Sequence, residues 1–180
     1  MELLKWQLYK FLLFVIGSKK EALKIVQKDG LELKNLPDHF KKDKEIVLKA
    51  VKSNGAALEF ADKSFRKDKE IVLAAVKQYG VTLEYADESL KKDKEIVMAA
   101  VKQNGSALYF ADETLKKDKE IVMAAVNQDA EALDYADESL KKDKDIIQLA
   151  LKQNDSEESL SYTLVGEELT YHSEIISKAD

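Results

Sequence analysis

Histidine is the side chain that most often carries acid–base or metal chemistry, and this 180-residue chain has two of them, His39 and His172. They lie far apart in the sequence, and there is no cysteine to complete a zinc site with either. A metal centre or a hydrolytic triad needs several such groups held together. We therefore expect both histidines to lie on the surface, without a catalytic or metal-binding role.

Carboxylates form a second candidate set, because adjacent acidic residues recur along the chain. General acid–base catalysis needs two carboxyl groups in different environments, so that their pKa values separate. Copies that return at equal intervals on exposed turns share one environment, and helix capping explains them. The recurring pairs are Asp87–Glu88, Asp112–Glu113 and Asp137–Glu138.

Phosphate-binding loops are not found either, since the chain contains no Gly-x-Gly-x-x-Gly and no Gly-Lys-Ser/Thr sequence. The sequence thus predicts a protein that is not an enzyme. It assigns no catalytic, cofactor-binding or metal-binding residue, and it implies no cofactor.

A 25-residue repeat organises the chain: residues 68–76 return almost unchanged as 93–101 and 118–126, with related copies from Asp43 and Asp143. A fixed period between about 20 and 50 residues is typical of stacked structural units. We expect an all-α fold, an αα-repeat solenoid with a 25-residue period and helical caps at both ends.

Each copy carries the signals of a short α-helix. Asp68 is placed to cap the first turn, and Glu70 puts negative charge at the positive end of the helix dipole. Gly80 follows the apolar run, where a left-handed residue commonly ends a helix. Ala130 replaces this glycine in a later copy. A left-handed alanine there costs roughly 1 kcal/mol, so we expect a strained or altered joint.

A second, shorter helix follows in each copy. Leu83, Ala86 and Leu90 are spaced as a helical stripe, and Tyr85 lies beside it. We expect this helix to break near Asp87, which then caps a final turn.

The repeat frame divides the whole chain into units. Open ends of a stack need caps, and the N-terminal apolar segment is placed to provide one. Membrane contact is the alternative for that segment, whose longest uncharged apolar run is too short for the ~20 residues of a span. We expect one domain: a capping helix at 1–17, a degenerate repeat at 18–42, repeats at 43–67, 68–92, 93–117 and 118–142, and a degenerate repeat with an acidic helical cap, including a helix over 167–177, at 143–180.

From Asp93 the sequence reads Asp-Lys-Glu-Ile-Val-Met-Ala-Ala-Val-Lys-Gln-Asn-Gly-Ser-Ala-Leu-Tyr-Phe-Ala-Asp. This string is similar to the repeat of a family known as domain of unknown function 4116, over residues 43 to about 154 and less closely over 18–42. The resemblance implies α-helical tandem repeats, often within longer proteins, and no assigned activity. It supplies no catalytic residues. Ala130 and Asp155 depart from the family's glycine.

The charge distribution and the cysteine content indicate the cellular compartment and the class of partner. The absence of cysteine fits a reducing compartment, and we expect a cytoplasmic protein. The net charge of −5 is concentrated after Lys152, where seven acids face one lysine. The body of the chain is therefore close to neutral, which favours a protein or peptide partner over nucleic acid.

Lysines cluster at each junction between repeats and form a possible binding ridge. A nucleic-acid backbone can follow such a ridge, but acids interleave with it and the only arginine is Arg66. Ion pairs on a solvated face are the expected state. The candidate ridge residues are Lys91, Lys92, Lys116 and Lys117.

Two tyrosines stand at positions that are polar in the other copies. Tyr79 replaces asparagine or aspartate, and Tyr109 replaces glutamate or aspartate. Exposed tyrosines are good interface anchors, so these two are the best candidates for a partner surface.

The sequence predicts a non-catalytic scaffold that binds a protein or peptide. Nucleic-acid contact through the lysine ridge, a structural module of a larger system, and an enzyme with a pocket around His39 or His172 are the alternatives. The partner and the oligomeric state remain open.

Overall fold

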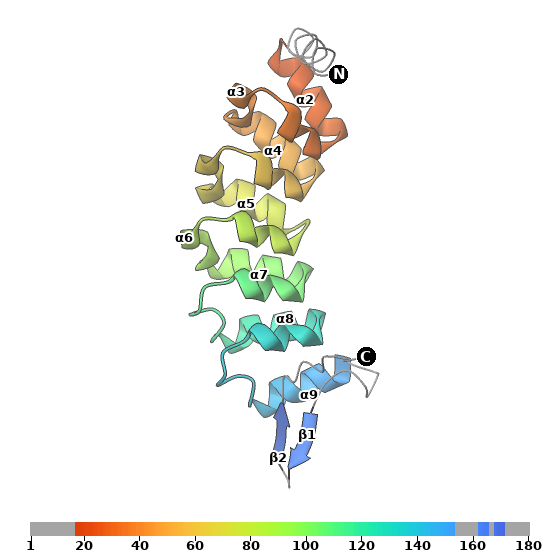
Figure 1. Ribbon diagram of the computed structural model, residues 1–180, viewed down its shortest axis with the longest axis vertical. Helices are drawn as coiled ribbons and strands as arrows, with labels where there is room; N and C mark the ends of the chain where they lie inside the picture. The colour runs from red at the N-terminus through yellow and green to blue at the C-terminus, as the bar shows by residue number, and fades with distance from the viewer. Residues whose placement is uncertain (1–16, 154–161, 166–167, 172–180) are drawn as a thin grey trace, which may run out of the picture.

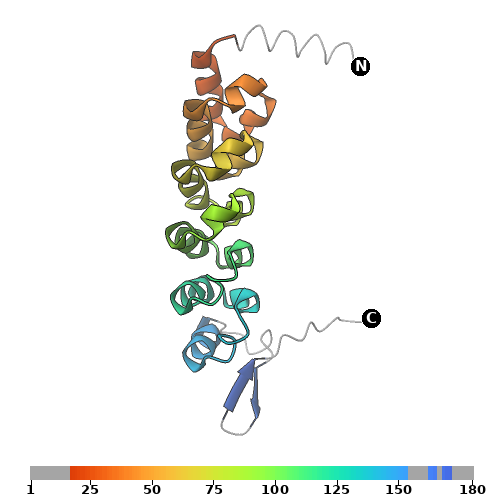
Figure 2. The same cartoon turned by 90° about the vertical axis from the view of Figure 1, so that its left-hand side faces the viewer.

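The computed structural model describes residues 17–153, 162–165 and 168–171, which form a helical repeat array (Figure 1). The all-α repeat fold expected from the sequence is confirmed. The array has two columns of helices, stacked along its long axis (Figure 2). One column holds the long helices: α2 (Lys19–Lys28), α4 (Lys44–Ser53), α5 (Lys69–Val76), α7 (Lys94–Gln103), α8 (Lys119–Gln128) and α9 (Lys144–Gln153).

An aspartate caps each long helix after α2, as the sequence predicted for Asp68. In α7, Asp93 Oδ1 accepts hydrogen bonds from the backbone N–H groups of Glu95 and Ile96, at 3.0 and 3.3 Å. These bonds satisfy two of the N–H groups that a helix start leaves free. The equivalent caps are Asp43, Asp68, Asp118 and Asp143.

The second column consists of six-residue 3-10 helices, where the αα-repeat prediction expected α-helices. In η5, Asn104 starts the helix by accepting a hydrogen bond from the N–H of Ser106 at 2.9 Å. Ala111 ends it in extended conformation, with ψ of 154°. Six residues are more than the three or four of a usual 3-10 run. The set comprises η1 (Gly30–Asn35), η2 (Gly55–Phe60), η4 (Gly80–Tyr85), η5 (Gly105–Phe110) and η6 (Ala130–Tyr135).

The predicted break near Asp87 is present. Asp87 accepts a hydrogen bond from the N–H of Ser89 and caps the one-turn helix α6 (Glu88–Lys91). The same place holds α3 (Asp38–Lys41) in one repeat and the 3-10 helix η3 (Lys63–Lys67) in another. After η5 and η6 it is a turn.

The core lies between the two columns. Ile96, Val97, Ala100 and Val101 of α7 are fully buried, and Leu108 of η5 packs against this helix from the second column. Because the same positions are buried in the neighbouring repeats, the core is continuous along the stack. The largest fully buried side chains in two of its rows are Ile46, Ile71, Ile96, Ile121 and Ile146, and Leu33, Leu58, Leu83, Leu108 and Leu133.

The joint glycines have a different role from the one predicted, since none of Gly30, Gly55, Gly80 and Gly105 has a positive φ. An extended asparagine or aspartate follows α4, α7 and α8, and Lys77 follows α5. The glycine is required by close approach to the next repeat. A Cβ atom on Gly80 would lie 2.3 Å from the carbonyl oxygen of Ala100 in α7.

Of the two outcomes expected at Ala130, strain is wrong and an altered helix end is present, because Asp129 follows α8 in extended conformation and the equivalent glycines are not left-handed. Ala130 is the first residue of η6 and is almost fully buried. The following helix, α9, lies at a slant to α8, whereas α7 and α8 run nearly parallel (Figure 1). The Ala130 side chain belongs to the hydrophobic core of the stack.

A β-hairpin follows the last long helix, where a capping helix over 167–177 was expected. The strands β1 (Tyr162–Val165) and β2 (Glu168–Tyr171) pair antiparallel, with Tyr162 opposite Tyr171 and Val165 opposite Glu168. The prediction is wrong for residues 168–171. Two runs rich in Tyr, Thr, Leu and Val around Gly166-Glu167 are the sequence signal of a hairpin.

The N-terminal cap predicted at residues 1–17 lies outside the described residues except for Gly17, as do residues 154–161, 166–167 and 172–180. None of the described helices is long and apolar enough to span a bilayer.

Candidate functional site

Tyr109 is the most exposed large hydrophobic side chain described, with 58% of its surface accessible. It lies near the end of η5. Its ring meets the ring of Tyr135 from η6 edge to face, with centroids 5.3 Å apart, and that of Phe110 at 5.1 Å. The Nζ of Lys116 lies 5.8 Å from the Tyr109 ring centroid, within the range of a cation–π contact. These four side chains form a surface that we call the Tyr109 cluster.

The repeat explains why this cluster occurs at one joint. Tyr109 occupies the place that Glu59, Glu84 and Asp134 hold in their 3-10 helices. Burial raises the pKa of Tyr85, and the carboxylates of Glu59 and Glu84 add to that shift. Between η2 and η4, the Glu59 carboxylate therefore faces the ring of Tyr85. Between η5 and η6, two aromatic rings meet instead.

Tyr79 lies one repeat away, at the start of η4, and is 47% exposed. Its side chain makes no capping hydrogen bond, unlike Asn54 and Asn104 at the equivalent positions. The hydroxyl of Thr82 instead donates to the carbonyl oxygen of Tyr79 at 2.7 Å. The ring also borders the joint, since a Cβ atom on Gly55 would lie 3.2 Å from its Cδ2. Tyr79 thus combines an exposed ring with a packing role that the sequence did not reveal.

The four candidate lysines divide into two kinds. Lys91 and Lys116 pair within their own turn with Glu88 and Glu113, both at 2.8 Å, and each is 16% exposed. Lys92 and Lys117 approach carboxylates of the following repeat at 3.7 Å and are 61% and 62% exposed. The ridge is therefore a row of ion pairs, with only Lys92 and Lys117 largely open to solvent.

A second row of ion pairs joins the starts of the long helices. Lys69 Nζ lies 2.7 Å from Asp93 and 2.9 Å from Glu95 of the next repeat. Each of these lysines thereby bridges a cap and a first-turn acid of its neighbour. The same contacts are made by Lys19, Lys44, Lys94 and Lys119.

These bridges make acid stability a testable property. The hydrogen bond from Lys69 lowers the pKa of Asp93 below its ordinary value of 3.8, burial opposes this, and the backbone N–H of Ile96 assists it. Lys94 and Lys119 lower the pKa values of Asp118 and Asp143 in the same way. Because the folded-state pKa is the lower one, the unfolded chain takes up protons first as the pH falls. The stabilisation is present above the ordinary pKa and is lost as the pH falls through the folded-state pKa.

We expect the free energy of unfolding to fall as the pH drops from about 5 to 2, and urea unfolding across that range measures it. An Asp93→Asn variant keeps a capping oxygen but cannot titrate, so its stability should depend less on pH. An identical pH dependence in the variant and the wild type would contradict the assignment of this carboxylate.

The candidate catalytic groups that the structure describes have structural roles or lie exposed on the surface. His39 is exposed on α3, with its ring 4.0 Å from that of Phe40, and His172 lies outside the described residues. Asp87 caps α6 and Glu88 pairs with Lys91, as the capping interpretation of the acidic pairs requires. In the described part of the chain, no three His, Asp or Glu side chains are arranged to hold a metal ion.

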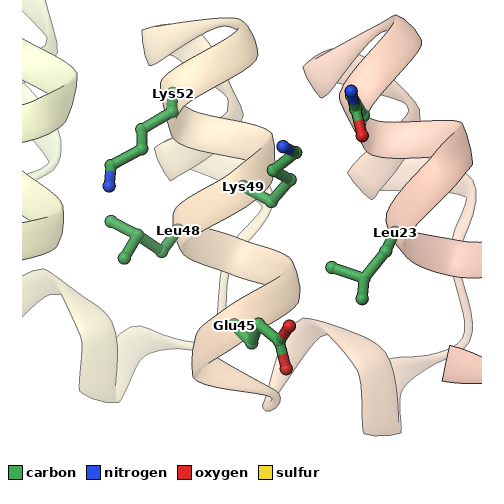
Figure 3. A pocket seen from close by; sticks show the side chains of 6 residues that line it. Leu23, Glu45, Leu48, Lys49 and Lys52 are labelled. Atoms are coloured by element: carbon green, nitrogen blue, oxygen red, sulfur yellow. The ribbon is translucent and has the colours of Figure 1, made fainter. Parts of the chain in front are cut away.

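A shallow groove of about 290 Å³ lies between α2 and α4 (Figure 3). Leu23 points into it from α2, and Lys49 from α4. A second hollow, of about 390 Å³, lies beside α3 and is lined by Glu32, Pro37 and Lys41 among others. His39 lines neither hollow.

Glutamines that hold the joints together were missed from the sequence. Gln78 Oε1 accepts a hydrogen bond from the N–H of Gly55 at 3.2 Å, and its Nε2 donates to the carbonyl oxygen of Lys52 at 2.6 Å. Gln103 and Gln128 accept from the next two joint glycines. Their return at the repeat interval was the available signal.

The comparisons with known proteins agree with this architecture. No curated protein and no solved structure matches the chain. The family model described as "Domain of unknown function (DUF4116)" matches residues 19–66, 68–116 and 118–170. Each match begins at a long helix, α2, α5 or α8, and spans two of the 25-residue repeats. In the first two matches, the connection between the two repeats contains an α-helix, α3 or α6, whereas the connection after the second repeat does not. The pairing of repeats is therefore also visible in the structure. The chain therefore belongs to the family of the domain of unknown function DUF4116.

Proposed function

We propose that this protein is a non-catalytic scaffold that binds a protein or peptide through the Tyr109 cluster. The observation that carries the proposal is the exposed aromatic side chain of Tyr109, at a place where three other repeats have a carboxylate. Tyrosine offers a large contact area for little conformational entropy, and it is enriched among the residues that dominate binding energy.

Tyr79 forms a second contact point on the preceding repeat, and the lysines form the rim. Lys92 and Lys117 offer exposed charge for orienting the partner, while Lys91 and Lys116 are held by their own acids. Rim charges act mainly on association rate and orientation. The cysteine-free composition supports a cytoplasmic location within this proposal.

The ion-paired state of the lysine ridge disfavours the nucleic-acid alternative. A phosphate backbone would have to displace Glu88, Glu113, Asp112 and Asp137 from their lysines. Salt distinguishes the two functions, because phosphate-driven affinity falls steeply between about 50 and 200 mM salt. Binding through the tyrosines should change little over that range.

The repeat itself supplies the variant that tests the proposal. Tyr79→Asn and Tyr109→Glu together give each position the residue of its neighbouring repeats. We expect this double variant to bind a partner recovered with the wild-type protein at least about tenfold more weakly by calorimetry. Stability should be maintained within about 1 kcal/mol, because the asparagine restores a helix cap.

Lys20→Ala with Lys63→Ala is the matched control, since both lysines are exposed, on α2 and η3, in repeats that contribute no residue to the cluster. It should bind like the wild type. Equal affinity of the tyrosine variant and the wild type for every recovered partner would refute the proposal.

A further inference from the structure

The outer face of the long helices, turned away from the 3-10 column, carries three rows of side chains. On α4, Glu45 lies near the helix start, Leu48 in the middle and Lys52 near the end (Figure 3). The 25-residue repeat places the same rows on the following helices. The middle row consists of Leu23, Leu48, Leu73, Met98 and Met123, and the last-turn row of Lys52, Lys77 and Lys102.

The middle row is apolar yet only partly buried. Met98 and Met123 remain partly accessible, whereas the inward Ile and Val residues of the same helices are completely covered. Alanines lie next to these residues at 74, 99 and 124, so the strip between the charged rows is apolar over three consecutive helices. Leucine and methionine at such positions provide an adaptable contact surface.

The two charged rows differ in whether their charge is compensated. Glu70, Glu95 and Glu120 each lie 2.8 to 3.1 Å from a lysine of the preceding repeat. Lys52, Lys77 and Lys102 are exposed and form no ion pair with another described residue. These exposed lysines therefore run along one side of the apolar strip, whereas on the other side each lysine is shared by two acids and the balance is negative.

The distance between successive apolar groups along the strip matches the seven-residue rise of an α-helix. Packed helices lie about 8 to 10 Å apart, so the strip offers one apolar group and one lysine at about that interval. An α-helix advances about 10.5 Å in seven residues. A helix lying along the stack would therefore bring every seventh residue over an equivalent position, and roughly 20 residues would cover α4, α5, α7 and α8.

We infer that this face docks an acidic amphipathic α-helix of a partner protein. The apolar residues of that helix recur every seven positions and lie on the Leu/Met row, while acidic residues on one flank pair with Lys52, Lys77 and Lys102. The groove between α2 and α4 receives one end of the helix. There Lys49 stands where later repeats have alanine, and it adds positive charge beside Leu23. This surface is separate from the Tyr109 cluster, which belongs to the 3-10 column.

A synthetic peptide of three heptads tests the inference, with leucine at one position of each heptad, glutamate on one flank and alanine or glutamine elsewhere. Fluorescence anisotropy against the full chain should show saturable binding. A peptide of the same composition with the seven-residue spacing broken should bind at least about tenfold more weakly. Equal binding of the two peptides would overturn the inference.

Charge reversal on the protein provides the second arm. Lys77→Glu with Lys102→Glu should weaken binding of the heptad peptide at least about tenfold, whereas Lys63→Glu with Lys142→Glu changes net charge equally and should have little effect. Equal losses in both pairs would show attraction to net charge alone and overturn the inference. Sedimentation of the free protein tests whether a second copy of the chain covers this face. Self-association that the Lys77/Lys102 variant abolishes would assign the face to a second copy and would also overturn the inference.

Discussion

A Gly80→Ala variant is expected to lose about 3 kcal/mol of unfolding free energy, at the upper end of the usual cost of overpacking. The added Cβ would lie 2.3 Å from the Ala100 carbonyl oxygen and 3.1 Å from Cβ of Asn104. The nearest obstacle is backbone within the buried helix α7, which cannot rotate aside as a side chain can. The joint must open, and the hydrogen bond between the Gly80 N–H and Gln103 is then lost.

Urea unfolding of the two proteins measures this loss. Ala130→Gly is the matched control, because that joint already accommodates a methyl group. Its stability should change by no more than about 1 kcal/mol, the usual difference between glycine and alanine in a helix. A Gly80→Ala variant as stable as the wild type would show that the joint is looser than the structure has it.

Leu108→Ala is expected to cost about 3 to 4 kcal/mol, within the range of buried leucine truncations. Leu108 is fully buried where η5 packs on α7 and α8. Truncation removes apolar contact and leaves a cavity that rigid neighbours fill poorly. Because repeats of a solenoid contact only their neighbours, a weakened central joint should also uncouple the two halves.

The expected signature is a lower urea midpoint together with a shallower unfolding transition. Met98→Ala is the control, since this side chain lies half-buried on the outer face and should cost only about 1 kcal/mol. Comparable losses for the two variants would contradict the assignment of the core to the space between the columns.

The helical repeat was predictable because its signals are local. Asp68 before an apolar run specifies a helix start by itself, and the observed cap bonds confirm it. Asp87 likewise marks a break that the structure contains. Each signal recurs in several copies, so the same interpretation applies to each of those repeats.

The role of the joint glycines was not predictable from local pattern. A glycine after a helix suits a left-handed end, but Gly80 is required by Ala100, a residue 20 positions further on. Only knowledge of how consecutive repeats pack distinguishes these explanations. The hairpin at 162–171 was missed for another reason, because the repeat frame was extended past its last clear copy over residues with strand-like composition.

The candidate site was predictable as residue identities and not as geometry. Tyr109 stands out in sequence because neighbouring repeats have acids there, but its contact with Tyr135 depends on the stacking of η5 on η6. For the lysines, the interleaved acids predicted ion pairs and the structure contains them, but the pairing of Lys92 and Lys117 with carboxylates of the following repeat depends on how the repeats stack.

Photo-crosslinking from position 109 tests the proposed binding role most directly. A benzophenone amino acid replaces Tyr109 in one protein and the exposed Lys63 of η3 in another. We predict that irradiation in the cells that produce the protein yields a discrete crosslinked partner from position 109 and none from position 63. The same set of products from both positions, or none from position 109, would contradict a partner surface at the Tyr109 cluster.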